Sequence, residues 1–329
     1  MASYLVIGSN SFSGAGFVDY LLSQGIDTVG VSRSEEVAMP FRIYAWDRRD
    51  AAFNFHRIDL NHDLDALMAL IDRERPSRIV NFAAQSMVGE SWQHPDHWMM
   101  TNVVSAVRLH ERLRHLDFLE KYVHVTTPEV YGSTEGWVRE DCHFQPSTPY
   151  AVSRAAGDMS LRSFHEAYAF PVLFTRAANV YGPGQQLYRI LPRTILYALT
   201  GKRLQLHGGG YSTRSFIHVR DVAAATYLVA EHGRLGDTYH ISTTKSVTIR
   251  DLVAGILRKL GLDIDACVEE VGERLGKDNA YMLDTGKIRA ELGWSDEISL
   301  ESGIRQTIDW VRENLTALQQ LPQSYVHKP

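Results

Sequence analysis

Near its N-terminus the chain reads Tyr4-Leu5-Val6-Ile7-Gly8-Ser9-Asn10-Ser11-Phe12-Ser13-Gly14. The apolar start predicts a buried strand, and the spacing of apolar residues over 17–22 predicts a helix directly after the glycines. Gly8 permits a tight turn, and Gly14 lets the helix pack closely on the strand. This order of strand, glycine turn and helix is typical of the first unit of a fold that binds a dinucleotide pyrophosphate.

Further apolar runs rich in β-branched residues predict strands at 28–31, 55–58, 78–82, 122–125 and 172–176. Helical patterns separate them, which predicts an α/β protein with a Rossmann-like doubly wound parallel sheet. The alternation loosens after about residue 180. We therefore expect a dinucleotide-binding domain over 1–180 and a smaller, interleaved C-terminal substrate domain over most of 181–329. Segments near 215–245, with a strand at 216–219, are expected to return to the main sheet.

Composition excludes several classes of protein. The 329 residues are 44% apolar and 22% charged with a net charge of −5, so there is no basic footprint for nucleic acid. Cys142 and Cys267 suggest no disulfide framework. The start shows no signal peptide, and no apolar run approaches the length of a membrane span. We expect a cytoplasmic protein with no membrane or nucleic-acid partner and no metal site.

The strand ends predict how a dinucleotide would be held. At the end of the 28–31 strand an acidic residue would select NAD, whereas Ser32-Arg33 favours NADP over NAD because an arginine accommodates a 2′-phosphate. An acid at position 59 can meet the adenine amino group, and the small residues after the 78–82 strand suit a nicotinamide ribose. The expected cofactor-binding residues are Gly8, Asn10, Ser11, Phe12, Gly14, Ser32, Arg33, Asp59, Leu60, Phe82, Ala83 and Ala84.

The candidate chemistry lies beyond the 122–125 strand, in Thr126-Thr127-Pro128-Glu129-Val130-Tyr131-Gly132. Glu129 follows a hydroxyl by two residues at the carboxyl end of a strand, where ligands bind in open α/β sheets. Tyr150 and Arg154 lie four residues apart on one face of an expected helix. A nearby cation favours the phenolate, so Tyr150 is a candidate proton acceptor for an alcohol.

Taken together, these motifs resemble the extended short-chain dehydrogenase/reductase family, specifically its nucleotide-sugar 4,6-dehydratases. The resemblance runs nearly end to end. The motifs that carry it, besides the glycine turn, are Ala83-Ala84-Gln85-Ser86, Thr101-Asn102-Val103, Thr127-Pro128-Glu129-Val130-Tyr131-Gly132, Tyr150-x-x-x-Arg154, Asn179-Val180-Tyr181-Gly182-Pro183, Arg214-Ser215-Phe216, Arg274-Leu275-Gly276-Lys277-Asp278 and Leu292-Gly293-Trp294.

The resemblance implies an enzyme that converts an NDP-hexose to an NDP-4-keto-6-deoxy sugar. A hydride leaves C4 for bound NAD(P), the C5 proton is removed, water is lost and the hydride returns to C6. The implied catalytic residues are Thr127, Glu129, Tyr150 and Arg154, with Tyr150 as the C4 base and Glu129 as the C5 base. Tyr150, Arg154 and Asn102 also join the implied cofactor contacts. The implied substrate-binding residues are Ser86, Thr127, Glu129, Asn179, Arg189, Arg214, Arg274, Asp278 and Tyr281.

Four positions depart from the family pattern: Ser11 for the middle glycine, Met87 for histidine, Pro128 for an acid and Arg154 for lysine. Pro128 cannot protonate the departing C6 hydroxyl, as the aspartic acid of dTDP-glucose dehydratases does. A nucleotide-sugar 4-epimerase or a UDP-glucuronate decarboxylase stays open as an alternative, as does a catalytically inactive relative that binds cofactor. Glu129 argues against the epimerase but not against the decarboxylase. By analogy with related enzymes, the 96–113 helix and the Tyr150 helix predict a homodimer seam.

Overall fold

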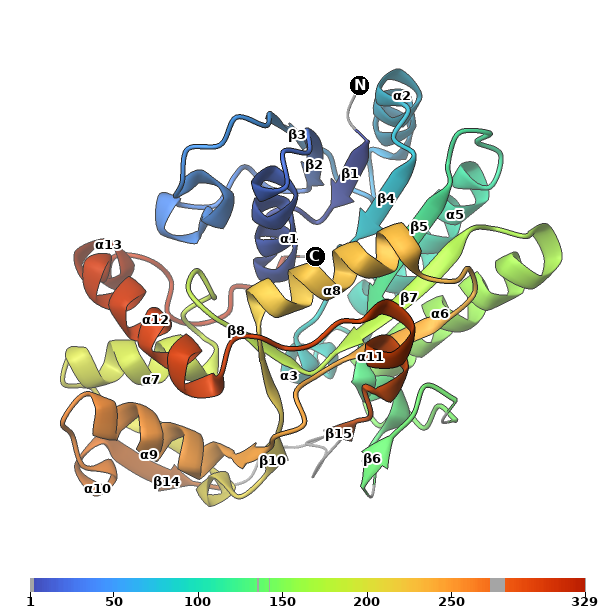
Figure 1. Cartoon of the computed structure of the whole chain (residues 1–329). Helices are drawn as coiled ribbons and strands as arrows, with labels where there is room; N and C mark the ends of the chain where they lie inside the picture. Colours follow the sequence, from blue (N-terminus) through green and yellow to red (C-terminus); the bar gives the residue numbers. More distant parts are fainter. Residues whose placement is uncertain (1–2, 135, 142, 273–281, 329) are drawn as a thin grey trace.

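The main sheet of the computed structural model contains seven parallel strands (Figure 1). The structure describes residues 3–134, 136–141, 143–272 and 282–328. The strands are β1 (Tyr4–Ile7), β2 (Thr28–Ser32), β3 (Phe53–Arg57), β4 (Arg78–Asn81), β5 (Lys121–Thr126), β7 (Val172–Ala177) and β12 (Thr238–Ile241). Their order is β12-β7-β5-β4-β1-β2-β3, so the direction of winding reverses between β1 and β4. The predicted doubly wound parallel sheet is confirmed, and this reversal is where such sheets bind ligands.

Helices cover both faces of the sheet because its strands alternate apolar side chains between two cores. Tyr4 and Val6 face one core, while Leu5 and Ile7 face the other. The first core takes α1 (Phe12–Ser23), α8 (Val219–His232) and α11 (Gly286–Leu292). The second core takes α2 (Leu64–Glu74), α5 (Ala106–Leu113) and α6 (Pro149–Tyr168). Burial on both faces explains why the strands read as continuous apolar runs.

The helix expected over 96–113 is present but contains an irregular turn. It begins as α4 (Pro95–Met99), widens into the π-helical segment η3 (Met100–Ser105) and continues as α5. A π-helical turn accommodates one residue more than the α-helical hydrogen-bonding pattern does. Asn102 lies inside this turn and is buried.

The smaller region packs around its own core. Four helices meet there, α7 (Ile190–Leu199), α9 (Ile249–Lys259), α12 (Leu300–Glu313) and α13 (Leu315–Gln319). Beside them, β9 (Leu204–His207) pairs with β14 (Val268–Val271), which follows α10 (Ile264–Cys267). In Figure 1 these elements lie beyond the carboxyl ends of the main strands. The domain boundaries at 1–180 and 181–329 stay a prediction.

One expected strand belongs to a different sheet. The 216–219 segment was expected in the main sheet, but β11 (Phe216–His218) pairs with β8 (Asn179–Tyr181) in a separate two-stranded sheet. The chain leaves the main sheet after β7, because the amide of Ala178 bonds to Ile241 while that of Asn179 bonds to Ser215. Among the described residues, β12 is therefore the last strand of the main sheet on this side.

The remaining elements are short. They are η1 (Met39–Phe41), η2 (Ile43–Ala45), α3 (Val88–Ser91), η4 (Pro128–Tyr131), β6 (Trp137–Val138), η5 (Gly208–Gly210), β10 (Thr213–Arg214), β13 (Val247–Thr248) and β15 (Met282–Leu283). Of the helices in the described ranges, none combines the length and the apolar character needed to cross a membrane.

Candidate active site

The glycine turn after β1 has the close contacts that its sequence predicts. Gly8 has φ +84°, and a Cβ there would lie 2.6 Å from the amide nitrogen of Ala83. A Cβ on Gly14 would lie 2.2 Å from the carbonyl oxygen of Gly8. Ser11 caps α1, and its Oγ accepts a hydrogen bond from the Gly14 amide at 3.1 Å. The turn therefore brings the start of α1 against the carboxyl end of β1.

The loop after β2 is tied to this turn. The Asn10 amide donates to the Oγ of Ser32 at 2.9 Å, and its side-chain nitrogen donates to the carbonyls of Ser34 and Glu35 at 3.0 and 2.9 Å. Asn10 and Ser32 thus hold the glycine turn and the loop after β2 together, next to the expected cofactor cleft. Arg33 is partly buried in the same loop.

These residues fit a dinucleotide. The glycine contacts leave no room for side chains beneath the turn, and the helix start supplies backbone amides and a positive dipole end for phosphate. After β3, the Asp59 carboxylate accepts from the Asn61 amide at 2.8 Å, which fixes its orientation.

Glu129 lies on a short, capped turn directly after β5. Thr127 has an extended backbone, and its Oγ1 accepts from the Glu129 amide at 3.2 Å. Pro128 occupies the first helical position, where no amide donor is needed. Gly132 closes the turn with φ +68°, and a Cβ there would lie 2.2 Å from the carbonyl oxygen of Gln145. The turn therefore fixes the carboxylate next to the strand end.

Tyr150 lies on the first turn of α6, which Thr148 caps. Its phenol is buried and hydrogen-bonds the side chain of Thr127. Burial raises the pKa of Tyr150 above its ordinary value; Arg154 is the strongest opposing influence, and Glu129 raises the pKa further. Arg154 lowers the pKa of Tyr150 as expected, but burial of the phenol raises this pKa by more.

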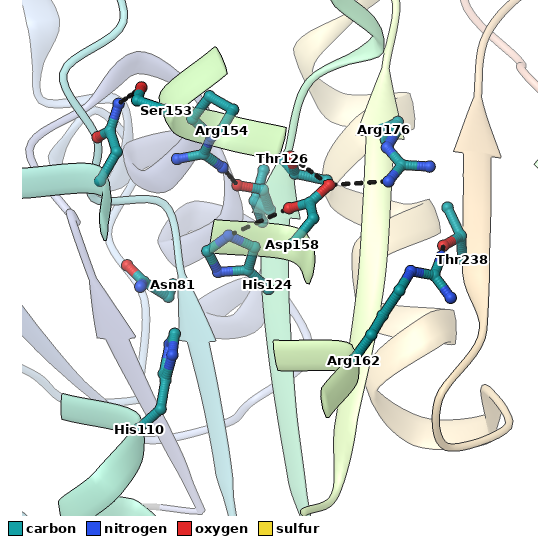
Figure 2. Close-up of polar contacts among 12 residues, drawn as sticks. Asn81, His110, His124, Thr126, Ser153, Arg154, Asp158, Arg162, Arg176 and Thr238 are labelled. Atoms are coloured by element: carbon teal, nitrogen blue, oxygen red, sulfur yellow. Dashed lines mark hydrogen bonds and ion pairs between the residues drawn. The ribbon is translucent and has the colours of Figure 1, made fainter. Parts of the chain in front are cut away.

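Arg154 is only 4% exposed and donates from Nη2 to the carbonyl of Val125. Its guanidinium therefore also anchors α6 to β5, as Figure 2 shows. A planar group with several donors can make this backbone contact and still present charge to the cavity.

A buried ionic network lies behind the strand end (Figure 2). Asp158, one turn after Arg154 on α6, accepts from Arg176 at 2.8 Å and from the Thr126 hydroxyl at 3.1 Å. Both charged side chains are 0% exposed. His124 lies 3.6 Å from Asp158, but burial lowers its pKa well below the ordinary value and the arginines lower it further, so the ring is neutral. The Asp158 carboxylate therefore balances the positive charge of Arg176.

A cavity of about 1240 Å³ joins the sheet edge to the smaller region. The predicted residues that line it are Ser11, Phe12, Phe82, Ala84, Ser86, Thr127, Glu129, Tyr150, Arg154, Asn179, Arg189 and Arg214. The predicted residues outside its lining are Gly8, Asn10, Gly14, Ser32, Arg33, Asp59, Leu60, Ala83 and Asn102. Arg274, Asp278 and Tyr281 lie outside the described residues. The catalytic candidates are thus brought together, while their individual roles stay predictions.

Asn102 is buried and hydrogen-bonded to the loop after β4 and to α6. Its Oδ1 accepts from the Gln85 amide at 2.9 Å, and its Nδ2 donates to the Gln85 carbonyl at 3.0 Å and to Ser153 Oγ at 2.9 Å. Ser153 in turn donates to the Tyr150 carbonyl at 2.7 Å. Asn102 therefore joins the loop after β4 to α6, and a direct cofactor contact stays a prediction.

Sequence reasoning missed Arg193 and Tyr188, which also line the cavity. Arg193 lies four residues after Arg189, which is the N-cap of α7 and has an extended backbone, so both arginines belong to the start of this helix. That spacing was the available signal. Within the described residues, no three histidine, cysteine or carboxylate side chains form a group that could hold a metal ion.

The fold and site define a class of nucleotide-dependent α/β enzyme, with a glycine turn, a tyrosine beside a cation and a glutamate at the central strand end. The family model described as GDP-mannose 4,6 dehydratase matches residues 5–307, and the chain belongs to that family.

Similar proteins are known in sequence and in structure. A dTDP-glucose 4,6-dehydratase of Streptomyces antibioticus is 35% identical, over 94% of this chain and 92% of its own. The structure of DesIV, a dTDP-glucose 4,6-dehydratase from Streptomyces venezuelae with NAD and TYD bound, has a TM-score of 0.87 and 32% identity over 95% of this chain and 98% of that one. A UDP-glucuronic acid 4-epimerase from Bacillus cereus, in complex with UDP-glucuronic acid and NAD, has a TM-score of 0.84 and 25% identity, over 94% and 99%.

Proposed function

We propose that this protein is a nicotinamide-dependent nucleotide-sugar 4,6-dehydratase, a hydro-lyase that makes an NDP-4-keto-6-deoxy sugar. The observation that carries the proposal is the grouping of Thr127, Glu129 and Tyr150 in one cavity that also reaches the start of α1. The similarity to named 4,6-dehydratases over nearly the whole chain supports it.

Each proton transfer has a candidate residue. Tyr150 accepts the proton of the C4 hydroxyl, with Thr127 as its hydrogen-bonding partner. The chemistry that the cofactor supplies when bound is reversible hydride transfer, from C4 of the sugar and back to C6. A ketone at C4 acidifies the proton on C5, and Glu129 on its capped turn removes it.

Loss of the C6 hydroxyl needs a proton that Pro128 cannot supply. Glu129 becomes a carboxylic acid when it takes the C5 proton, so it can return that proton to the departing hydroxyl. A water in the cavity is the other possible source. One carboxyl group then serves as base and as acid in consecutive steps, because the proton it takes from C5 is the one it gives to the departing hydroxyl.

The cofactor is a nicotinamide dinucleotide, and the similar structures named above hold NAD. Our finer proposal is NADP. It rests on Ser32, whose hydroxyl bonds to the Asn10 amide, and on Arg33 next to it, because an arginine at this strand end accommodates a 2′-phosphate. Dissociation constants for NADP and NAD, measured for wild type and Arg33→Ala, test it. Equal NADP affinity in the two proteins would refute the assignment.

The arginines of the cavity support a diphosphate-bearing substrate. Arg189, Arg193 and Arg214 line it together with the catalytic candidates. Two phosphates in a cleft partly shielded from water favour bidentate cationic partners. Ser86 and Asn179 line the same cavity and are proposed to contact the substrate.

A homodimer and a cytoplasmic location complete the proposal. Apolar side chains are exposed on α6 and the adjoining η3 turn, with Val152 at 40%, Met159 at 62%, Met100 at 43% and Val104 at 37%. Exposed apolar residues on adjacent helices are typical of an interface between protein chains.

The test is turnover of dTDP-glucose, UDP-glucose, GDP-mannose and UDP-glucuronate in deuterated water, followed by mass spectrometry. Loss of water with deuterium at C5 supports the dehydratase. Conversion without a change in mass indicates epimerisation, loss of carbon dioxide indicates decarboxylation, and no turnover indicates a binding protein.

Two variants assign the roles. Glu129→Gln keeps the shape of the side chain and should lower C5 exchange at least about 100-fold, because it removes the base. Tyr150→Phe should block cofactor reduction itself, read as absorbance at 340 nm. Unchanged exchange in the first variant, or rapid reduction in the second, would remove that residue from its role.

A further inference from the structure

The segment 322–328 lies as an extended strip across the cleft. Side chains at 323, 325 and 327 are partly buried, while those at 324, 326 and 328 are exposed. This alternation shows that one face of the strip packs on the protein. In Figure 1 the chain runs from α13 back toward α1, where the C label lies.

The first half of the strip is anchored to the smaller region. The Gln323 carbonyl accepts from Arg193 at 3.3 Å, and its side-chain oxygen accepts from Lys202 at 3.0 Å. Tyr325 packs edge-to-face on Tyr188, with ring centroids 5.5 Å apart. Tyr188 and Arg193 line the large cavity, so the strip starts at its rim.

The second half is anchored to α4. The His327 ring lies parallel to His94, His97 and the fully buried Trp98, at centroid distances of 5.2, 5.1 and 5.2 Å. Its Nε2 lies 2.8 Å from the Nδ1 of His97, a hydrogen bond between the two rings. The strip thus joins the two sides of the cleft.

Lys328 then crosses the place where the sheet changes direction. Its carbonyl accepts from Gln85 Nε2 at 2.7 Å, and its Nζ donates to Ser34 Oγ at 2.9 Å. Gln85 follows β4 and Ser34 follows β2, and β1 lies between these two strands. Lys328 therefore spans the carboxyl end of β1, where the glycine turn begins.

We propose that the 322–328 segment is a strap that closes over the phosphates of a bound dinucleotide, and that Lys328 binds those phosphates. The inference rests on the dinucleotide cofactor proposed above. The turn from Gly8 to Gly14 contains no basic residue, so its amides hold phosphate without a full positive charge. An ammonium across the end of β1 supplies that charge from the opposite side.

Binding measurements test the strap without relying on turnover. Dissociation constants for NAD and NADP are measured by calorimetry for wild type, Lys328→Ala, Lys328→Arg and a variant ending at Leu321. We expect Lys328→Ala to weaken binding about 5-fold to 20-fold and Lys328→Arg to stay within about 3-fold of wild type, because the charge is kept. The shortened variant should bind at least as weakly as Lys328→Ala. Lys259→Ala on α9 is the control for loss of one lysine.

A second readout is chymotryptic cleavage after Tyr325, which bound dinucleotide should slow in wild type and in Lys328→Arg. Dinucleotide affinity that stays unchanged in Lys328→Ala and in the shortened variant would overturn the strap. Tighter binding in the shortened variant would overturn it as well, since the segment would then be a plug that competes with the cofactor. Failure of wild type to bind either dinucleotide would instead overturn the proposed function.

Discussion

Removing the Asp158 carboxylate should destabilise the whole protein. Asp158→Asn keeps the size of the side chain but leaves the Arg176 guanidinium buried without its counter-charge. The neighbouring His124 carries no charge, because burial and the arginines lower its pKa, so Asp158 is the counter-charge of Arg176 alone. Breaking a fully buried pair from one side costs about 3–5 kcal/mol. A typical domain is stable by only about 5–15 kcal/mol, so the loss is a large part of the total.

Urea unfolding followed by tryptophan fluorescence measures this loss. The control is Asp65→Asn, which removes a carboxylate paired with Arg112 at 2.9 Å on the surface, where side-chain exposures are 92% and 48%. That change should have little effect, because solvent screens exposed pairs. The double variant Asp158→Leu/Arg176→Met should recover most of the stability, since apolar replacement of both partners of a buried pair is often neutral.

The reasoning is refuted if Asp158→Asn costs no more than Asp65→Asn. It is also refuted if the double variant loses as much stability as Asp158→Leu and Arg176→Met lose separately, added together, because then the pair is not coupled. Thr126 donates to Asp158 and directly precedes Thr127, so a confirmed loss should be accompanied by a lower kcat at temperatures where the variant stays folded.

Three further predictions concern the site itself. Arg154→Ala removes the largest influence that lowers the pKa of Tyr150, and because the base must be deprotonated, the acidic limb of the kcat/KM profile should move to higher pH; an unmoved limb would contradict the role of the cation. Gly132→Ala forces a Cβ at φ +68° to within 2.2 Å of the Gln145 carbonyl oxygen, so it should cost about 1–3 kcal/mol in urea unfolding and lower kcat. Ser11→Ala removes the cap of α1 and should cost about 1 kcal/mol by the same measurement, whereas wild-type stability would show that the cap contributes nothing.

Local patterns in the sequence predicted most of the fold. The strand at Tyr4–Ile7 and the glycine turn after it are each specified by adjacent residues, as are the strands that follow. β11 was placed in the wrong sheet because its own residues predict a strand but not which strand pairs with it. Partner choice depends on the bend after β7, which is a non-local feature.

The candidate site was predictable in position but not in detail. Glu129 and Tyr150 could be placed at strand and helix ends, which are local features, and they do line one cavity. The pKa of Tyr150 depends on how deeply the phenol is buried, which no sequence spacing indicates. Lys328, almost 300 residues from Ser34, meets it only in the folded chain.

The widened turn η3 makes its helix less regular but places Asn102 where it can bond to Gln85 and Ser153. A single-residue deletion within Met100–Ser105 would restore the ordinary α-helical hydrogen-bonding pattern, so the isolated segment would become a better helix. The same deletion would rotate everything before it by about 100° relative to α5, since each residue turns an α-helix by that angle. Asn102 would lose its hydrogen bonds to Gln85 and Ser153, and His97 on α4 would move away from His327. The chain with the deletion would therefore have the more regular helix and the less well-ordered site.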